Sequence, residues 1–419
     1  MNKIVIKATA DELEPDRTEE LKRYIRVGDK YMKEVFEPDK KGNLYRNYKE
    51  RQRQTIKDDW DNGFLKAIKK YEGFCNVPSH TNYKQEIHGF FNEYCPLTHI
   101  PKEGDCCTIL QILKHIFQDK FDFALDYFQL LYTQPTQRLP ILLLESQERN
   151  TGKSSFGNLL LLLFQDNAIK LGNGDLESDF NAIWIKRLVV VIDETSLDKK
   201  GIMQMLKRLS TETGKTTSNE KNKAQTQTDF FGKFVFMSNE EGSALPIERG
   251  ETRFAVFKVS TFSEKGISEI NNIETFIKNE IPAFIHLLQN RKMVHKDTSR
   301  MYFSPDVYLT KELLAYYENS VSQIARAIKE LVKDTFTMFP EQAELKFSLS
   351  NVVSELKYNV RNIEKEKVRK AIENELGLKP EKKQRYTFYS LQTAESIGNH
   401  LSSEIAQNNV PYTFIRERL

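Results

Sequence analysis

Between residues 139 and 259 the chain alternates short, continuous apolar runs with polar or helical stretches. The apolar runs are ILLL, LVVVI, FVFM and FAVFKV. Short, fully apolar runs are typical of strands buried on both faces, and their alternation with helices is typical of a sheet covered by helices. The pattern therefore predicts an α/β unit in this part of the chain.

The flanking regions have different patterns. Residues 108–132 repeat apolar residues at helical spacing, which predicts one or two amphipathic helices with their aromatic stripe in the core. After about residue 262 the pattern is mostly helical to residue 335, and two further helices with a basic turn near KPEKKQRYTFYSL then resemble a winged helix. Residues 1–70 are highly charged and contain the turn-rich segment EPDKKGN, which favours a small helical or partly ordered adaptor.

Composition narrows the class of protein. A chain of 419 residues exceeds what one hydrophobic core usually supports, so two to four structural units are expected. The net charge of +3 is the small difference between 62 Lys+Arg and 59 Asp+Glu, which excludes a histone-like polycation and leaves nucleic-acid binding to local basic patches. The longest apolar run, LLLLLF at 159–164, is too short to span a bilayer, so we expect a soluble, cytoplasmic protein with no membrane partner.

A loose group of cysteines and histidines leaves two interpretations open. Its members are Cys75, His80, His88, Cys95, His99, Cys106 and Cys107. No CxxC or HxxxH pair occurs among them, and zinc sites usually contain such close ligand pairs. We therefore expect scattered reduced thiols and imidazoles, with a zinc site as the alternative.

A phosphate-binding loop is predicted directly after the first apolar run. LPILLLESQERNTGKSSFGNLLLLLF has the order strand, loop, helix, and the loop ends in Gly-Lys-Ser, the second half of the P-loop pattern. In that pattern helix N–H groups face the phosphates, Lys153 reaches the β- and γ-phosphates, and the Ser154 hydroxyl holds Mg²⁺. The predicted ATP-binding residues are Asn150, Thr151, Gly152, Lys153, Ser154 and Ser155. Gln147 stands where the pattern has its first glycine, which weakens the motif on its own.

Two carboxylates end the next long apolar run. LVVVIDE at 188–194 predicts a strand with Asp193 and Glu194 at its carboxyl end, about forty residues after the lysine. Asp193 would hold Mg²⁺ through a water, and Glu194 would orient and deprotonate the attacking water. The alternative is a strand that simply ends in a polar turn.

Two later strands supply further candidates. FVFMSN ends in Asn239, whose amide suits contact with a γ-phosphate and the attacking water. ERGETRFAVFKV places Arg249 and Arg253 near another strand, where a guanidinium suits a γ-phosphate bound by an adjacent subunit. The alternative for the arginines is a surface salt bridge with Glu248 or Glu251. We favour Arg253, which immediately precedes the strand, although the sequence leaves the choice between the two open.

The order of these motifs resembles superfamily 3 helicases, the AAA+ ring motors of small viruses, phages and mobile elements. NTGKSS resembles their Walker A motif, VVVIDE their Walker B motif, FVFMSN their motif C and TRFAVF their arginine-finger strand. The segment between VVVIDE and FVFMSN resembles their B′ region, with Lys221 and Lys223 where the family has DNA-contacting hairpin lysines. HIF at 115–117, the P-x-Q-x-L-P entry, SDFN at 178–181 and KRLST resemble the helicase half of phage and bacterial-element primase-helicases.

The resemblance implies an α/β P-loop AAA+ core with an N-terminal helical region and a C-terminal helical and winged-helix domain. It implies an ATP- and Mg²⁺-dependent replicative DNA helicase that moves on single-stranded DNA as a homohexameric ring, encoded by a phage or mobile element in a bacterial host, with a primase or replisome partner. The expected regions are a charged adaptor (1–70), a helical collar for oligomerisation (71–135), the ATPase (136–262), a helical region (263–335), the winged helix (336–395) and a tail (396–419).

Two other functions stay open from the sequence. One is a P-loop ATPase that separates no strands, such as a loader, a packaging motor or a defence enzyme. The other is a DNA-binding replication scaffold with a decayed nucleotide site, which Gln147 would suit. A second DNA contact at 361–385, with nine Lys/Arg against five Glu, is also open, since the glutamates can pair with the lysines on a solvated helix face. For Lys221 and Lys223 the alternative is a solvated loop.

Overall fold

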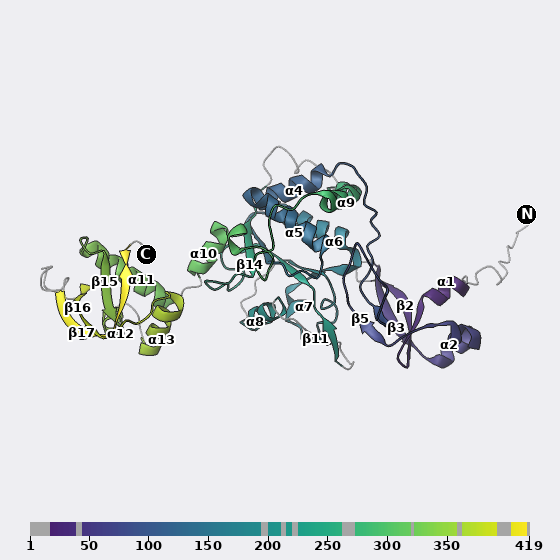
Figure 1. The fold of residues 1–419 in the computed structure, drawn as a ribbon, viewed down its shortest axis with the longest axis horizontal. Helices are drawn as coiled ribbons and strands as arrows, with labels where there is room; N and C mark the ends of the chain where they lie inside the picture. Colours follow the sequence, from purple (N-terminus) through teal and green to yellow (C-terminus); the bar gives the residue numbers. More distant parts are fainter. Residues whose placement is uncertain are drawn as a thin grey trace, which may run out of the picture. The chain divides into compact units, whose positions relative to one another are not determined.

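The structure is a computed structural model that describes residues 17–38, 44–193, 200–210, 215–219, 225–261, 273–319, 322–357, 363–391 and 404–416. The chain divides into two compact units (Figure 1). Unit 1 comprises Met1–Pro246 and Thr252–Leu313, and unit 2 comprises Ile247–Glu251 and Leu314–Leu419. Among the helices that the structure describes, none has the length and apolar character needed to cross a membrane.

The centre of unit 1 is a parallel five-stranded sheet, which confirms the α/β prediction. Its strands are β8 (Ile141–Glu145), β9 (Ala168–Leu171), β10 (Val189–Asp193), β13 (Lys233–Ser238) and β14 (Phe254–Lys258). The order across the sheet is β14-β8-β13-β10-β9, and every neighbouring pair is parallel. Every residue of β8 and β13 is buried, as expected for strands with both faces covered.

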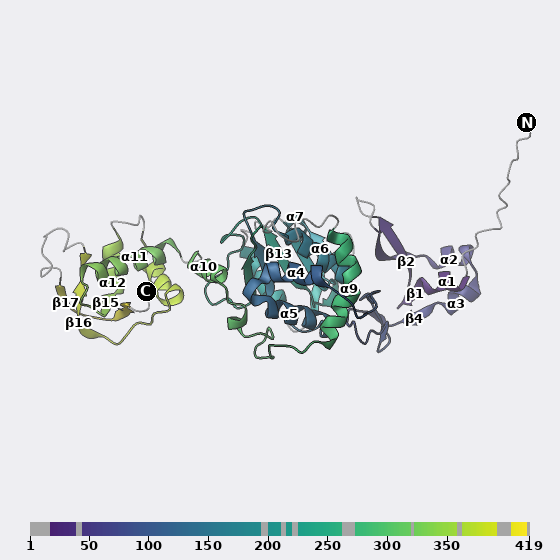
Figure 2. The ribbon, with the colours of Figure 1, turned by 90° about the horizontal axis from the view of Figure 1, so that it is seen from above.

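Four helices pack together over one face of this sheet (Figure 2). They are α4 (Cys107–Phe117), α5 (Phe121–Thr133), α6 (Lys153–Phe164) and α9 (Ile273–Asn290). The predicted amphipathic stretch is thus two helices, separated by a short 3-10 turn that begins at Gln118, whose φ is +47°. Phe117 contacts Phe156 of α6 with ring centroids 5.6 Å apart, so the aromatic stripe lies in the core as predicted.

The prediction of a helical N-terminal region is wrong for its described part. A four-stranded sheet of order β3-β2-β1-β4 forms there instead. The strands are β1 (Tyr24–Val27), β2 (Lys30–Pro38), β3 (Leu44–Arg51) and β4 (Lys69–Tyr71), with short helices α2 (Arg53–Asp59) and α3 (Asn62–Ala67). EPDKKGN does not separate two units, because its first two residues, Glu37 and Pro38, lie in β2 and pair with Tyr45 and Leu44 of β3. The charge reflects two long strands whose described side chains are half-buried or exposed, while a small core around Tyr24, Ile56 and Phe64 holds the sheet on the helices.

Residues 71–106 are also not helical. They contain a small sheet of β5 (Gly73–Cys75), β6 (Glu86–Ile87) and β7 (Phe90–Asn92), so the helical part of the predicted collar begins only at Cys107. The His80 ring bonds the Tyr132 carbonyl at 2.8 Å and the Tyr94 hydroxyl at 2.5 Å, and burial lowers the pKa of His80 to about 4. In the described part of the chain no three His, Cys, Asp or Glu side chains are grouped to hold a metal ion.

Unit 2 has the element order helix, strand, helix, helix and then three strands. After α10 (Lys311–Asn319), these elements are α11 (Gln323–Met338), β15 (Glu344–Ser348), α12 (Leu349–Leu356), α13 (Lys365–Lys370), β16 (Gln384–Tyr389), β17 (Glu404–Asn409) and β18 (Pro411–Ile415). β15 pairs with β18, and β16 pairs with β17. The predicted boundary at residue 395 is therefore wrong, because the expected tail supplies two strands, with Tyr412 and Phe414 in the same core as α11 and α12.

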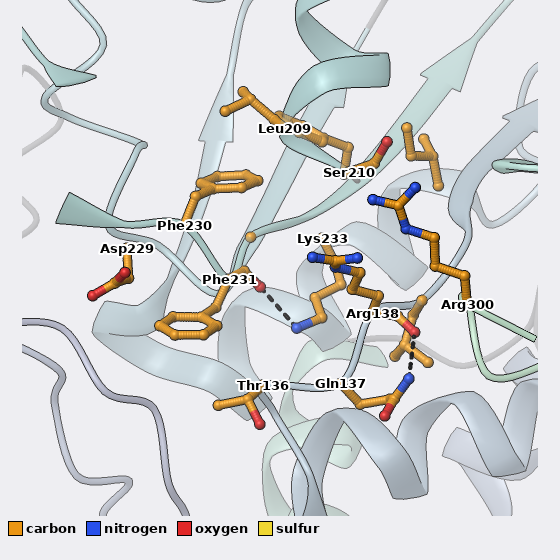
Figure 3. A pocket seen from close by; sticks show the side chains of 14 residues that line it. Thr136, Gln137, Arg138, Leu209, Ser210, Asp229, Phe230, Phe231, Lys233 and Arg300 are labelled. Atoms are coloured by element: carbon orange, nitrogen blue, oxygen red, sulfur yellow. Dashed lines mark hydrogen bonds between the residues drawn. The ribbon is translucent and has the colours of Figure 1, made fainter. Parts of the chain in front are cut away.

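Lys233 is a buried cation at the start of β13. Its ammonium donates to the carbonyl oxygens of Phe231, at 2.7 Å, and of Pro135 (Figure 3). The side chain is only 5% exposed, and burial lowers the pKa of Lys233 from 10.5 to about 7.

This shift predicts a pH-dependent stability. Between pH 7 and 10.5 the unfolded chain binds more protons at this lysine than the folded chain, so stability rises with pH across that window. The contribution is at most about 1.4 kcal/mol per pH unit. In urea unfolding at pH 7 to 9, Lys233→Met is expected to flatten the rise, whereas replacing the exposed Lys66 by Met leaves it unchanged. Equal slopes for the two variants would contradict the shift.

Candidate nucleotide site

The carboxyl ends of the five parallel strands meet at one edge of the sheet. Pairing places Ser238 and Lys258 on either side of Glu145, and Asp193 beside Met237. Ligands of open parallel sheets bind at this edge, where loops and helix N-termini follow the strands. The predicted residues that follow β8, β10 and β13 therefore belong to one site region.

The loop between β8 and α6 is shaped for an anion. Gly152 precedes the helix with φ +87° and ψ 0°, a left-handed conformation that costs glycine nothing, and Asn150 has φ +55°. No side chain caps this end of α6, and its first internal bond runs from the Phe156 amide to the Gly152 carbonyl at 3.0 Å. The first-turn N–H groups and the helix dipole thus face the loop. Thr151 is buried and Ser154 is exposed on the first turn.

Lys153 lies at the centre of the site. Its ammonium donates to the Ser146 carbonyl at 2.8 Å and to Oδ1 of Asn239 at 3.2 Å. Burial lowers the pKa of Lys153, and the nearby carboxylates of Asp193, Glu241 and others oppose that effect. The structure therefore brings together three of the predicted residues, one from each of three strand-end loops.

Asp193, the last residue of β10, has a second basic neighbour. Lys170 of β9 forms an ion pair with its Oδ2 at 2.5 Å. No sequence motif indicates Lys170, because β9 is a short, partly buried edge strand. The adjacent Glu194 lies outside the described residues.

Two glutamates anchor the loops around the site, and the sequence analysis named neither. Glu145 is 3% exposed and accepts from the Gly242 amide at 3.0 Å. Glu241 accepts from the Gln147 amide at 3.0 Å and pairs with Lys258 at 2.7 Å. Gln147 is not among the described residues with positive φ, so this position does not need glycine, and its backbone holds the loop to the neighbouring strand end.

His115, from the HIF segment, ties the phosphate-loop region to the edge strand. Its Nε2 bonds the carbonyl oxygens of Thr151 at 3.1 Å and Ser260 at 3.0 Å. These contacts link α4, the loop before α6 and the segment after β14. In the sequence, the resemblance of HIF to a family motif is what indicates His115.

The two arginines belong to different units of the chain. Arg253 precedes β14, and its carbonyl accepts from the Ile141 amide at 2.7 Å, at the edge where the strands begin. Since Lys258 and not Arg253 pairs with Glu145, about 16 Å of strand separates Arg253 from the edge that carries Lys153. Arg249 is exposed and belongs to unit 2.

A hairpin follows α8 (Lys200–Leu209), as the sequence predicts. β11 (Lys215–Ser218) and β12 (Thr226–Asp229) pair antiparallel. Lys221 and Lys223 fall between these strands in the sequence and lie outside the described residues.

A comparison with known protein families matches nearly the same part of the chain as the motifs. Residues 144–253 match a family model described as a family of unknown function (DUF5906), which spans nearly the same segment as the motifs. A search of curated proteins found no match.

Solved structures of the NrS-1 C-terminal region have a similar fold. One apo structure is 18% identical, aligns over 85% of this chain and 84% of that chain, and has a TM-score of 0.58. An A-form apo structure is 14% identical, aligns over 94% and 96%, and has a TM-score of 0.61. An X-ray structure of JCV helicase aligns at 12% identity over 55% of this chain and 66% of that chain, with a TM-score of 0.31, from which we draw nothing. The chain thus shares the NrS-1 C-terminal fold over most of its length.

Proposed function

We propose that the protein is an ATP-hydrolysing motor that moves along single-stranded DNA as a homohexameric ring and separates duplex strands, in replication of a phage or mobile element within a bacterial cytoplasm. The observation that carries this proposal is the meeting of Lys153, Asp193 and Asn239 at the carboxyl edge of the parallel sheet, in front of the α6 N-terminus. A cation, a carboxylate and an amide around a helix N-terminus are the groups that ATP hydrolysis needs.

The residues present fit a nucleotide with Mg²⁺. The α6 N–H groups and Lys153 would hold the phosphates, with the residues from Asn150 to Ser155 forming the loop around them. Ser154 and Asp193 provide the oxygen ligands that Mg²⁺ prefers. Bound Mg²⁺ would neutralise charge on the phosphates. Glu194 would accept the proton of the attacking water, and Asn239 would orient that water and the γ-phosphate.

The sheet topology supports an AAA+ ring motor. Numbered along the chain, the five strands have the order 5-1-4-3-2, with the lysine loop after strand 1, the carboxylate on strand 3 and the asparagine after strand 4. Arg253 is too far from its own subunit's site to contact a bound γ-phosphate, which supports a role in the site of a neighbour.

Unit 2 supports DNA binding. From α11 to β17 the order helix, strand, helix, helix, strand, strand is that of a winged helix, a module that commonly places a helix in a DNA groove, and β18 follows as an additional strand paired with β15. We propose this role for residues 322–416, and a primase or replisome protein as a partner of the ring.

Strand displacement tests the function. The protein is expected to release a labelled strand from forked DNA with ATP and Mg²⁺, and to release none without ATP. ATP hydrolysis without strand release would favour a loader or packaging ATPase. Binding to DNA without hydrolysis would favour a scaffold with a decayed site.

A mixing experiment tests the shared site. Arg253→Ala and Lys153→Ala proteins are each expected to be inactive alone, because each lacks one half of every interface site. Rings mixed from the two contain some interfaces with both residues, so ATPase activity is expected to recover to about a quarter of the wild-type rate at equal mixing. Mixing is verified by co-purification through two different tags. Mixed rings that stay inactive would contradict the role of Arg253 in a neighbour's site.

A further inference from the structure

A second cavity lies in unit 1 at the edge of the sheet opposite to Lys153, where β8 and β13 begin. Its volume is about 470 Å³, which is enough for one nucleotide. Three basic side chains line it, Arg138, Lys233 and Arg300, and Figure 3 shows the two guanidinium groups near each other. Among its lining residues, Asp229 is the one carboxylate. The proposed ATP site uses none of these residues.

The basic side chains of this cavity differ in how they are held in its wall. Lys233 is held by two backbone carbonyls, so it is a fixed part of the wall. Arg138 is half-buried, and both burial and the nearby Arg300 lower its pKa. Arg300 is exposed, and two guanidinium groups that repel each other in the lining of a cavity favour an anion between them, because the anion offsets the repulsion.

Aromatic rings lie beside the charges. Phe230 and Phe231 are half-buried at the cavity, and Phe230 is held in place by edge contacts with Trp184, at 6.3 Å between centroids. Gly232 keeps this segment tight, since a Cβ there would lie 2.5 Å from the Phe230 ring. Cations next to fixed aromatic rings are the combination that holds the phosphate and base of unpaired nucleotides.

The cavity is continuous in sequence with the predicted DNA-gripping hairpin. Asp229 is the last residue of β12, and Phe230, Phe231 and Gly232 join it directly to β13. The cavity wall is therefore close in sequence to the hairpin that would contact the nucleic-acid strand. The sheet edge that carries the proposed ATP site is at the other end of β13.

We propose that this cavity binds one nucleotide unit of single-stranded nucleic acid, with its phosphate between Arg138 and Arg300 and its base against Phe230 or Phe231. This inference rests on the proposed function, since it assigns a second contact for the same strand.

The test compares Arg138→Gln/Arg300→Gln with Arg53→Gln/Lys66→Gln, a control that removes the same charge from exposed positions on α2 and α3. Binding of labelled oligo(dT) is measured by fluorescence anisotropy over a range of salt concentrations. The cavity variant is expected to bind at least about 10-fold more weakly at low salt, with a log–log salt slope shallower by about 1.4 for two lost phosphate contacts. The control is expected to keep the wild-type slope, and both variants are expected to keep ATP affinity.

Further arms identify the source of the phosphate. Inorganic phosphate and thymidine monophosphate are each titrated as competitors, and oligo(dT) containing bromodeoxyuridine is cross-linked by light and mapped by mass spectrometry. Cross-links to the peptide with Phe230 and Phe231 in the wild-type protein support the inference independently of any variant's folding.

Tight binding of the free monophosphate in place of oligo(dT), or an unchanged salt slope with no cross-link to that peptide, would overturn the inference. If wild-type protein binds no single strand at all, the proposed function fails together with this inference. If the wild-type protein unwinds DNA and the cavity variant binds oligo(dT) as the wild type does, the inference is overturned while the proposed function stands.

Discussion

Replacing Lys153 by alanine is expected to weaken ATP binding by at least about 100-fold, or about 2.7 kcal/mol, and to abolish ATP hydrolysis. The ammonium is buried beside Asn239 and Asp193, at the N-terminus of α6, where a phosphate would replace the Ser146 carbonyl as its partner. Binding is measured with a fluorescent ATP analogue and hydrolysis by phosphate release.

Two comparisons make this result specific to the phosphate contact. Glu194→Gln is expected to keep ATP affinity and lose hydrolysis, because that residue would activate water and not hold phosphate. Lys66→Ala, an exposed lysine outside the site, is expected to change neither quantity. Equal ATP affinity in the wild type and Lys153→Ala, with both proteins folded by circular dichroism, would remove the P-loop assignment.

Neutralising both hairpin lysines is expected to abolish unwinding while basal ATPase activity survives. Lys221 and Lys223 are two residues apart, so on a hairpin they would share one face, which in a ring would point toward the phosphates of the strand. Lys221→Ala/Lys223→Ala is expected to bind single-stranded DNA more weakly, with up to about two fewer phosphate contacts per engaged subunit in the salt dependence. Strand displacement on a fork and ATPase without DNA are measured on the same preparation.

The matched control is Lys292→Ala/Lys296→Ala, which removes two exposed lysines of unit 1 outside the hairpin. It is expected to unwind at the wild-type rate. Should the hairpin variant also unwind at that rate, the hairpin is not the element that grips DNA, and the correspondence with the B′ region is wrong.

The sequence predicted the sheet well where strands are buried on both faces. The runs of β8, β10, β13 and β14 have no polar interruption, so neither length nor pattern suggested a helix. β9 escaped notice because it is a short edge strand whose AIKL sequence is only partly buried. Lys170, the ion-pair partner of Asp193, lies on β9 and was therefore not predicted as a site residue either.

The N-terminal sheet was missed for a different reason. In β2 and β3 charged residues occupy much of each strand because none of the described side chains there is fully buried, and high charge in a sequence is otherwise typical of weak order. Alternation of Tyr and charged residues was present, but propensity for strands depends on context more than propensity for helices does. Residues such as Glu145 and Glu241 could not be predicted as anchors, because their partners come from loops far away in sequence.

The position of β8 in the sheet affects how the protein is made. β8 is the first core strand to leave the ribosome, yet its two neighbours, β13 and β14, are the last two core strands to be synthesised. Until residue 238 has emerged, this buried and almost wholly apolar strand has no partner on either edge, and one edge stays open until residue 258 has emerged; such edges invite aggregation. Nascent chains stalled before β14 should therefore depend on chaperones, and fragments that end between β10 and β14 should be insoluble when expressed.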